Sequence, residues 1–193
     1  MKIVYIHGAN ATPRSFNFIQ SSLPYHEQLN ISYNVETPLQ ENINNIINEI
    51  QTNVGNREFH IIGHSLGGVI AVGLHNKFNN LNKTFSMSAP FGGSKFIDYL
   101  KWICPGYRLF SDLKTSSPII REIRKTKIHK PFIQVVTSGG GNPLFGEPND
   151  GTVSVSSQII LENIKYLHYE LHHFEVLLSH KIVEEIDNFI FKT

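Results

Sequence analysis

Short, largely apolar runs alternate along the chain with longer segments in which apolar residues recur every three or four positions. The short runs predict β-strands at residues 3–6, 31–35, 59–62, 84–88, 132–137 and 164–171. The longer segments predict helices at residues 14–23, 40–54, 69–77 and 176–190. Because strands alternate with helices, we expect an α/β protein: about six parallel strands with helices on both faces of the sheet.

The length of the chain indicates a single domain. Its 193 residues are enough for one substantial hydrophobic core and too few for two large ones. We therefore assign residues 1–193 to one domain. Only the stretch 91–130 breaks the alternation of strands and helices, and it is a candidate cap or lid over the edge of the sheet.

Charge and hydropathy narrow the range of partners. A formal net charge of +1 provides no overall attraction for nucleic acid, and we expect none as a partner. No apolar stretch is long enough to predict a membrane-spanning segment. Residues 1–8 do not resemble a signal peptide, so we expect a cytoplasmic location, with export of a trimmed precursor or by a signal-less route as the alternative. A single cysteine, Cys104, excludes an intrachain disulfide and a multi-cysteine metal site.

The sequence contains none of the common cofactor motifs. It has no phosphate-binding Walker motif, no dinucleotide fingerprint and no pair of histidines with an accompanying glutamate at the spacing of a zinc site. We therefore expect neither a cofactor nor a metal ion.

One motif carries specific chemistry. Gly63-His64-Ser65-Leu66-Gly67 fits the pattern G-x-S-x-G and lies between a predicted strand and a predicted helix. A nucleophilic serine occupies this position in a sharp strand-to-helix turn, where flanking side chains would strike the neighbouring elements. The N-terminus of the following helix also favours the negative charge that develops during attack. Ser65 is therefore the candidate nucleophile, and a helix-capping serine is the alternative.

Three further segments strengthen the assignment. Together with the motif, residues 6–9 (Ile-His-Gly-Ala), 88–94 (Ser-Ala-Pro-Phe-Gly-Gly-Ser) and 113–123 resemble small bacterial lipases and esterases of the α/β-hydrolase superfamily. The nearest groups are the minimal lipases and the lipase-like relatives of GPI inositol-deacylase. The resemblance implies a serine hydrolase with a Ser-His-Asp triad in the chain order serine, acid, histidine.

The resemblance directs the search for the base and the acid to two loops. The base belongs after the last strand, where His172 and His173 are neighbours, and the similarity of residues 173–178 to minimal lipases favours His173. The acid belongs after the strand 132–137. Asp150, in an Asp-Gly-x-Val setting, is the candidate there, with Glu147 as the alternative.

The resemblance also implies an oxyanion hole made of backbone N–H groups. One donor is the residue after the nucleophile, Leu66. The other comes from the loop after the first strand and corresponds to Ala9, with the Asn10 side chain as a neighbouring candidate.

These residues together predict hydrolysis of a carboxylic ester, either a small molecule or a lipid. Acyl transfer or thioester cleavage by the same triad is the alternative enzyme class, because the triad alone does not select the acceptor or the leaving group. A binding module without activity is a third hypothesis, and it would require a broken triad.

Overall fold

The computed structural model describes residues 1–24, 26–94 and 111–192, and it contains one central sheet. The sheet has six strands in the order β2-β1-β3-β4-β5-β6, and every neighbouring pair is parallel. Because all strands run the same way, their carboxyl ends meet at one edge. The loops that follow the strands therefore come together there.

The strands are β1 (Lys2–Ile6), β2 (Glu27–Ile31), β3 (Phe59–His64), β4 (Leu81–Met87), β5 (Phe132–Thr137) and β6 (Lys165–Tyr169). The α-helices are α1 (Asn17–Ser22), α2 (Leu39–Val54), α3 (Leu66–Leu74), α6 (Pro118–Lys125), α7 (Val155–Gln158) and α8 (His180–Phe191). Three short 3-10 helices complete the described elements: η1 (Pro13–Phe16), η2 (Pro143–Phe145) and η3 (Glu175–Leu178).

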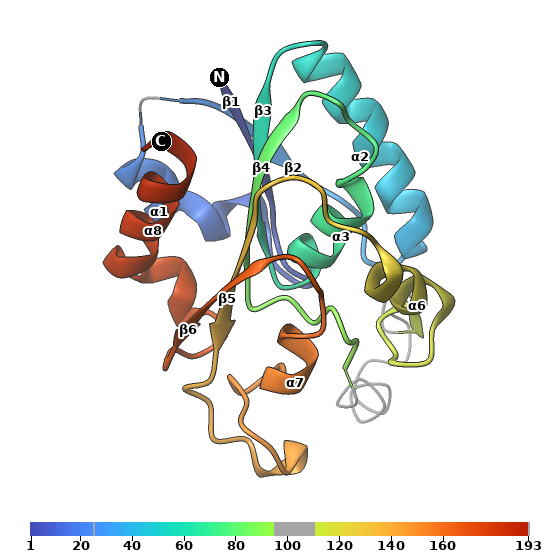
Figure 1. Cartoon of the computed structure of the whole chain (residues 1–193), viewed down its shortest axis with the longest axis vertical. Helices are drawn as coiled ribbons and strands as arrows, with labels where there is room; N and C mark the ends of the chain where they lie inside the picture. Colours follow the sequence, from blue (N-terminus) through green and yellow to red (C-terminus); the bar gives the residue numbers. More distant parts are fainter. Residues whose placement is uncertain (25, 95–110, 193) are drawn as a thin grey trace.

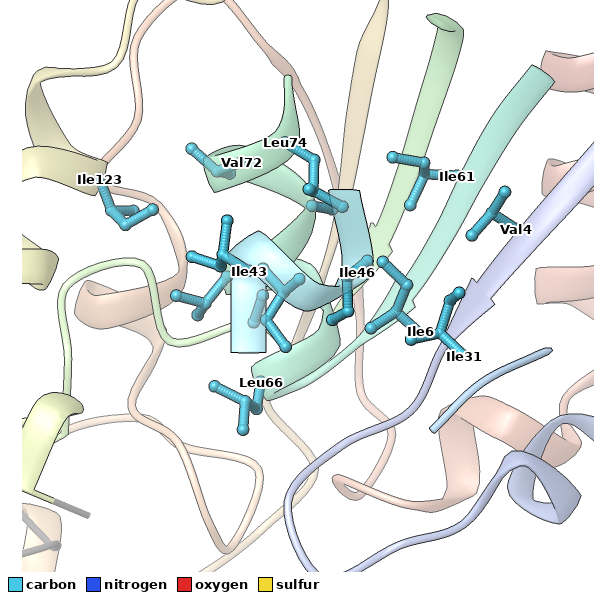
Figure 2. Close-up of a cluster of buried hydrophobic side chains, with 14 of the residues drawn as sticks. Val4, Ile6, Ile31, Ile43, Ile46, Ile61, Leu66, Val72, Leu74 and Ile123 are labelled. Carbon is cyan, nitrogen blue, oxygen red and sulfur yellow. The ribbon is translucent and has the colours of Figure 1, made fainter. Parts of the chain in front are cut away.

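Helices cover both faces of the sheet. Helices α1 and α8 lie on one face, and α2, α3 and α6 lie on the other (Figure 1). Each face has its own buried apolar cluster. Figure 2 shows part of the cluster beneath α2 and α3, in which Leu66 is fully buried. Because Leu66 directly follows Ser65, its burial anchors the start of α3.

Full burial explains why most strands can be recognised in the sequence. All six residues of β3 and all six of β5 are buried, because both strands lie between other strands and under helices. Such strands appear in the sequence as nearly continuous apolar runs. The predicted α/β class and the six parallel strands are confirmed.

The prediction of a strand at residues 31–35 was wrong. The strand is β2, Glu27–Ile31, which lies at the edge of the sheet and buries only Ile31 fully. Tyr33 and Val35 supplied the misleading alternation. They lie in the following loop and pack, partly buried, against the core.

The C-terminal helical segment is also divided. The apolar spacing predicted one helix across residues 176–190, but the structure has η3 followed by α8, with Ser179 between them. Val176 and Ile182 are nevertheless both buried in the same cluster, so the apolar pattern correctly identified the packed face.

The predicted cap at residues 91–130 lies partly outside the described residues, which resume at 111. Helix α6, at the end of this stretch, buries Ile120 and Ile123 in the core cluster next to α3. In the part of the chain that the structure describes, no helix is both long and apolar enough to cross a membrane.

Candidate active site

Ser65 lies in the sharp turn between β3 and α3. Its backbone has φ of 54° and ψ of −119°, a conformation that residues other than glycine rarely adopt. A hydrogen bond of 2.8 Å from the Ser65 N–H to the Met87 carbonyl oxygen ties the turn to the end of β4. The side chain is only half-buried, so the hydroxyl is presented at the carboxyl edge of the sheet.

The turn is possible because glycines let backbones approach closely. A Cβ atom on Gly67 would lie 1.9 Å from the carbonyl oxygen of Ile6, and one on Gly63 would lie 2.7 Å from that of Gly67. Gly8 brings the loop after β1 to the serine, since a Cβ there would lie 3.1 Å from Ser65 Cβ. The loop after β1 and the turn after β3 therefore form one compact unit.

Asp150 and His173 are hydrogen-bonded although 23 residues separate them. The Nδ1 of His173 lies 2.8 Å from Asp150 Oδ2, and both residues are at most 3% exposed. A backbone bond of 3.0 Å from the His173 N–H to the Asp150 carbonyl oxygen fixes the two loops together. Since a carboxylate accepts the proton on Nδ1, it leaves Nε2 free to act as an acceptor.

The Asp150 carboxylate is surrounded by donors. Its Oδ1 accepts the N–H groups of Thr152 at 3.0 Å and Val153 at 2.7 Å, and its Oδ2 accepts the Thr137 hydroxyl at 2.6 Å. Burial alone would raise the pKa of the Asp150 carboxyl. The hydrogen bonds and charge of His173, with the donors Thr137 and Val153, outweigh burial and hold that pKa below its ordinary value. Asp150 is therefore an ionised acceptor at neutral pH.

His64 connects the serine turn to the histidine loop. Its Nε2 donates to the carbonyl oxygen of His173 over 2.8 Å, and the two rings lie 4.9 Å apart between centroids. Burial lowers the pKa of His64 to about 3, so its ring is neutral. Among the described residues, the Ser65 hydroxyl and His173 make no hydrogen bond. Such bonds are often long in ligand-free enzymes and tighten when substrate binds.

Two backbone N–H groups at the site have donor capacity to spare. Leu66 is the first residue of α3, so its N–H has no carbonyl partner within the helix. The carbonyl oxygen of Gly8 accepts from His7 Nδ1 at 2.8 Å and from the Ala11 N–H at 3.3 Å. Because the peptide is trans, the N–H of Ala9 points away from those donors. In the described residues, no backbone hydrogen bond uses the Ala9 N–H.

The alternative residues occupy different environments from the preferred ones. His172 is exposed, and its backbone N–H donates to Glu175 Oε2 at 3.0 Å. Glu147 is half-buried and lies outside the hydrogen bonds of Asp150 and His173, whereas Asp150 itself is 1% exposed. Asn10 is exposed and has a positive φ of 55°.

Sequence reasoning missed the residues that support Asp150 and His173. His64 appeared only as the variable position of the G-x-S-x-G pattern, and Thr137 only as the end of a strand. A polar residue at the carboxyl end of a largely apolar buried run was a usable signal for Thr137. Within the described ranges, no three His, Cys, Asp or Glu side chains are grouped so that they could hold a metal ion.

Solved structures of similar shape identify the fold. The mature form of the Bacillus licheniformis lipase BlEst2 superposes with a TM-score of 0.80 at 18% identity, over 98% of this chain and 91% of that chain. The chain has the α/β-hydrolase fold. An alpha/beta superfamily hydrolase from Oenococcus oeni PSU-1 gives a TM-score of 0.69 at 15% identity, over 100% and 92% of the two chains.

Further comparisons agree with the hydrolase fold. A lipase-esterase related protein from Clostridium acetobutylicum gives a TM-score of 0.67 at 20% identity, over 97% of this chain and 93% of that chain. Residues 2–84, less than half of the chain, match an uncharacterised protein family, UPF0227. No curated protein matches the sequence. At these identities the likeness establishes the fold and not the activity.

Proposed function

We propose that this chain is a serine hydrolase that cleaves carboxylic esters through an acyl-enzyme on Ser65. The observation that carries the proposal is the buried hydrogen bond of 2.8 Å between His173 Nδ1 and Asp150 Oδ2. In the hydrolase fold this pair belongs beside a serine in the β3–α3 turn, where Ser65 lies. Neighbours described as a lipase and as lipase-esterase related add support.

In the proposed reaction, the Ser65 oxygen attacks the ester carbonyl carbon while His173 Nε2 takes the hydroxyl proton. The carbonyl oxygen becomes an oxyanion, which the N–H groups of Ala9 and Leu66 stabilise. When the intermediate collapses, His173 returns the proton to the departing alcohol and the acyl group remains on Ser65. Water then attacks the acyl-enzyme and gives a proton to His173. When this second intermediate collapses, His173 returns the proton to the Ser65 oxygen and the carboxylic acid is released.

The electrostatics of the site suit this proton transfer. Asp150 is ionised and buried, so it stabilises the imidazolium that forms on His173 during attack. The nearby His64 ring is neutral because burial lowers its pKa to about 3. It therefore adds no positive charge that would oppose protonation of His173.

The decisive experiment combines fluorophosphonate labelling with hydrolysis of a p-nitrophenyl ester series. We expect Ser65→Ala to abolish labelling and to lower kcat by about four orders of magnitude or more, because no other group forms the acyl-enzyme. Ser22→Ala is the matched control: among the described residues, this hydroxyl donates only to the Phe18 carbonyl oxygen of its own helix. Labelling or turnover that survives in Ser65→Ala would refute the proposal. Reactions with and without added alcohol separate hydrolysis from acyl transfer.

A further inference from the structure

A row of buried hydroxyl groups leads from β4 to the carboxylate of Asp150. Ser88, directly after β4, has its Oγ 2.7 Å from Oγ1 of Thr137, the last residue of β5. The Thr137 Oγ1 lies 2.6 Å from Asp150 Oδ2. All three residues are at most 1% exposed, so water does not compete for these contacts.

The direction of each proton in this row is determined. Asp150 is an ionised acceptor, so the hydrogen between it and Thr137 must come from the threonine hydroxyl. A hydroxyl has only one hydrogen, so Thr137 accepts at its contact with Ser88. Ser88 therefore donates to Thr137, and Thr137 donates to Asp150. The two hydrogen bonds strengthen each other, because a hydroxyl that accepts a hydrogen bond becomes a better donor.

Gln158 fixes the position of Thr137. The Thr137 N–H donates to Gln158 Oε1 at 2.9 Å, and Gln158 Nε2 donates to the Thr137 carbonyl oxygen at 2.9 Å. These backbone groups point to the same side of β5 as those of Val135, whose carbonyl oxygen accepts from the Ser88 N–H. The buried amide thus replaces β4 where that strand has ended. Thr137 is held by its backbone while its hydroxyl reaches Asp150.

The carboxylate oxygen that receives the Thr137 hydroxyl is the one that receives His173. Both donors converge on Asp150 Oδ2, while Oδ1 is occupied by two backbone N–H groups. We propose that Thr137, oriented by Ser88, is a positioning residue that holds Asp150 Oδ2 in line with His173 and tempers its negative charge. The inference deepens the proposed function and depends on it for the role of His173 in turnover.

Removing the Thr137 hydroxyl has a defined electrostatic consequence. Oδ2 would lose a donor and present more negative charge to His173, which favours the imidazolium form. Asp150, from the loop after β5, and His64, from β3, are the titratable side chains that contact His173 in the described chain. His64 is neutral, so its charge does not change over the range tested. The acidic limb of the kcat/KM profile, where His173 must lose its proton, should therefore move to higher pH.

The test compares Thr137→Val, Thr137→Ser and Ser88→Ala, with Thr84→Val as the matched control. Thr84 is also fully buried in the sheet, on β4, and within the described residues its hydroxyl has no hydrogen-bond partner. Two readouts are taken: the pH profile of ester hydrolysis, and the NMR titration of the His173 ring. The second needs no substrate, and His173→Ala identifies the signal.

For Thr137→Val we expect kcat to fall about tenfold with KM within about twofold, because a hydrogen bond to a charged group is lost. The acidic limb of the kcat/KM profile and the NMR titration of the His173 ring should both move to higher pH than in the wild type. Thr137→Ser should restore the wild-type values, Ser88→Ala should shift them less, and Thr84→Val should leave them unchanged. If Thr137→Val does not fold, the smaller shift in Ser88→Ala carries the test.

Two results would overturn the inference. One is a His173 titration in Thr137→Val or Ser88→Ala that coincides with that of the wild type. The other is a loss of activity that Thr137→Ser does not restore and that follows the loss of thermal stability. A shifted titration in a protein that lacks Ser65-dependent hydrolysis would instead refute the proposed function and leave the positioning role of Thr137 standing.

Discussion

The serine turn, residues 63–67, and the loops that carry the proposed acid Asp150 and the proposed base His173, called the acid–base loops below, are held at the same edge of the sheet by different physical means. The turn is held by close packing of backbones: Gly67 lies so near Ile6 that a Cβ atom would meet its carbonyl oxygen at 1.9 Å. The acid–base pair is held by side-chain hydrogen bonds, with Thr137, His173 and two backbone N–H groups converging on Asp150. The serine turn therefore depends on the small volume of its glycines, and the acid–base loops depend on hydrogen-bond donors and charge.

The difference determines which changes each region tolerates. In the serine turn we expect an added methyl group to lower stability even though no polar group changes, because the closely packed backbones leave no room for it. In the acid–base loops an isosteric change is harmful if it removes a proton or a charge, because the partners are buried and left unsatisfied. Substitutions of both kinds are therefore expected to separate the two regions, and they are taken from the largest expected effect to the smallest.

The largest effect should come from the base. His173→Ala should lower kcat by about four to six orders of magnitude, because no other histidine in the described chain is hydrogen-bonded to Asp150. His172→Ala should change kcat by less than about tenfold, since this side chain is exposed. Steady-state kinetics on one ester measures both. A larger loss of kcat in His172→Ala than in His173→Ala would show that His172 is the base.

The acid should have the next largest effect, and the test leaves volume unchanged. Asp150→Asn should retain the fold but lower kcat by about three to four orders of magnitude, because an amide can hold the His173 ring in the wrong tautomer. Circular dichroism and kcat check the two parts of this expectation.

Glu147→Gln provides the control in the same loop. It should be nearly silent, because Glu147 lies outside the hydrogen bonds that surround Asp150. The acid would have to be reassigned if Glu147→Gln proved the damaging substitution.

The contrast between the two regions also explains how much could be predicted from the sequence. The serine turn is encoded in five consecutive residues, because close packing constrains the chain locally, and the motif located it. The support of Asp150 joins residues as far apart as Ser88 and His173. No spacing rule connects them, so sequence reasoning identified the loops and their candidate residues but not the hydroxyl row behind them.

A similar contrast separates the strands that could be predicted from the sequence from the one that could not. Buried strands such as β3 and β5 are largely apolar, and the predicted strands overlap them. The edge strand β2 is mostly exposed and carries Glu27, Gln28 and Asn30, so it has no apolar signature. Its hydrogen bonds to β1 define it, and those are not visible in a hydropathy pattern.

The smallest of these effects, and the sharpest test of the packing side of the comparison, is a single methyl group. Gly67→Ala places a Cβ atom 1.9 Å from the Ile6 carbonyl oxygen, a backbone atom that cannot rotate away. We expect a loss of about 3 kcal/mol in unfolding free energy, at the upper end of overpacking effects. Gly141→Ala, in the acid loop, has nothing within 4 Å of the new atom and should change stability by less than about 0.5 kcal/mol. Urea unfolding of the two variants measures the difference. Equal stabilities would show that β1 and α3 can separate, and that close packing does not hold the serine turn.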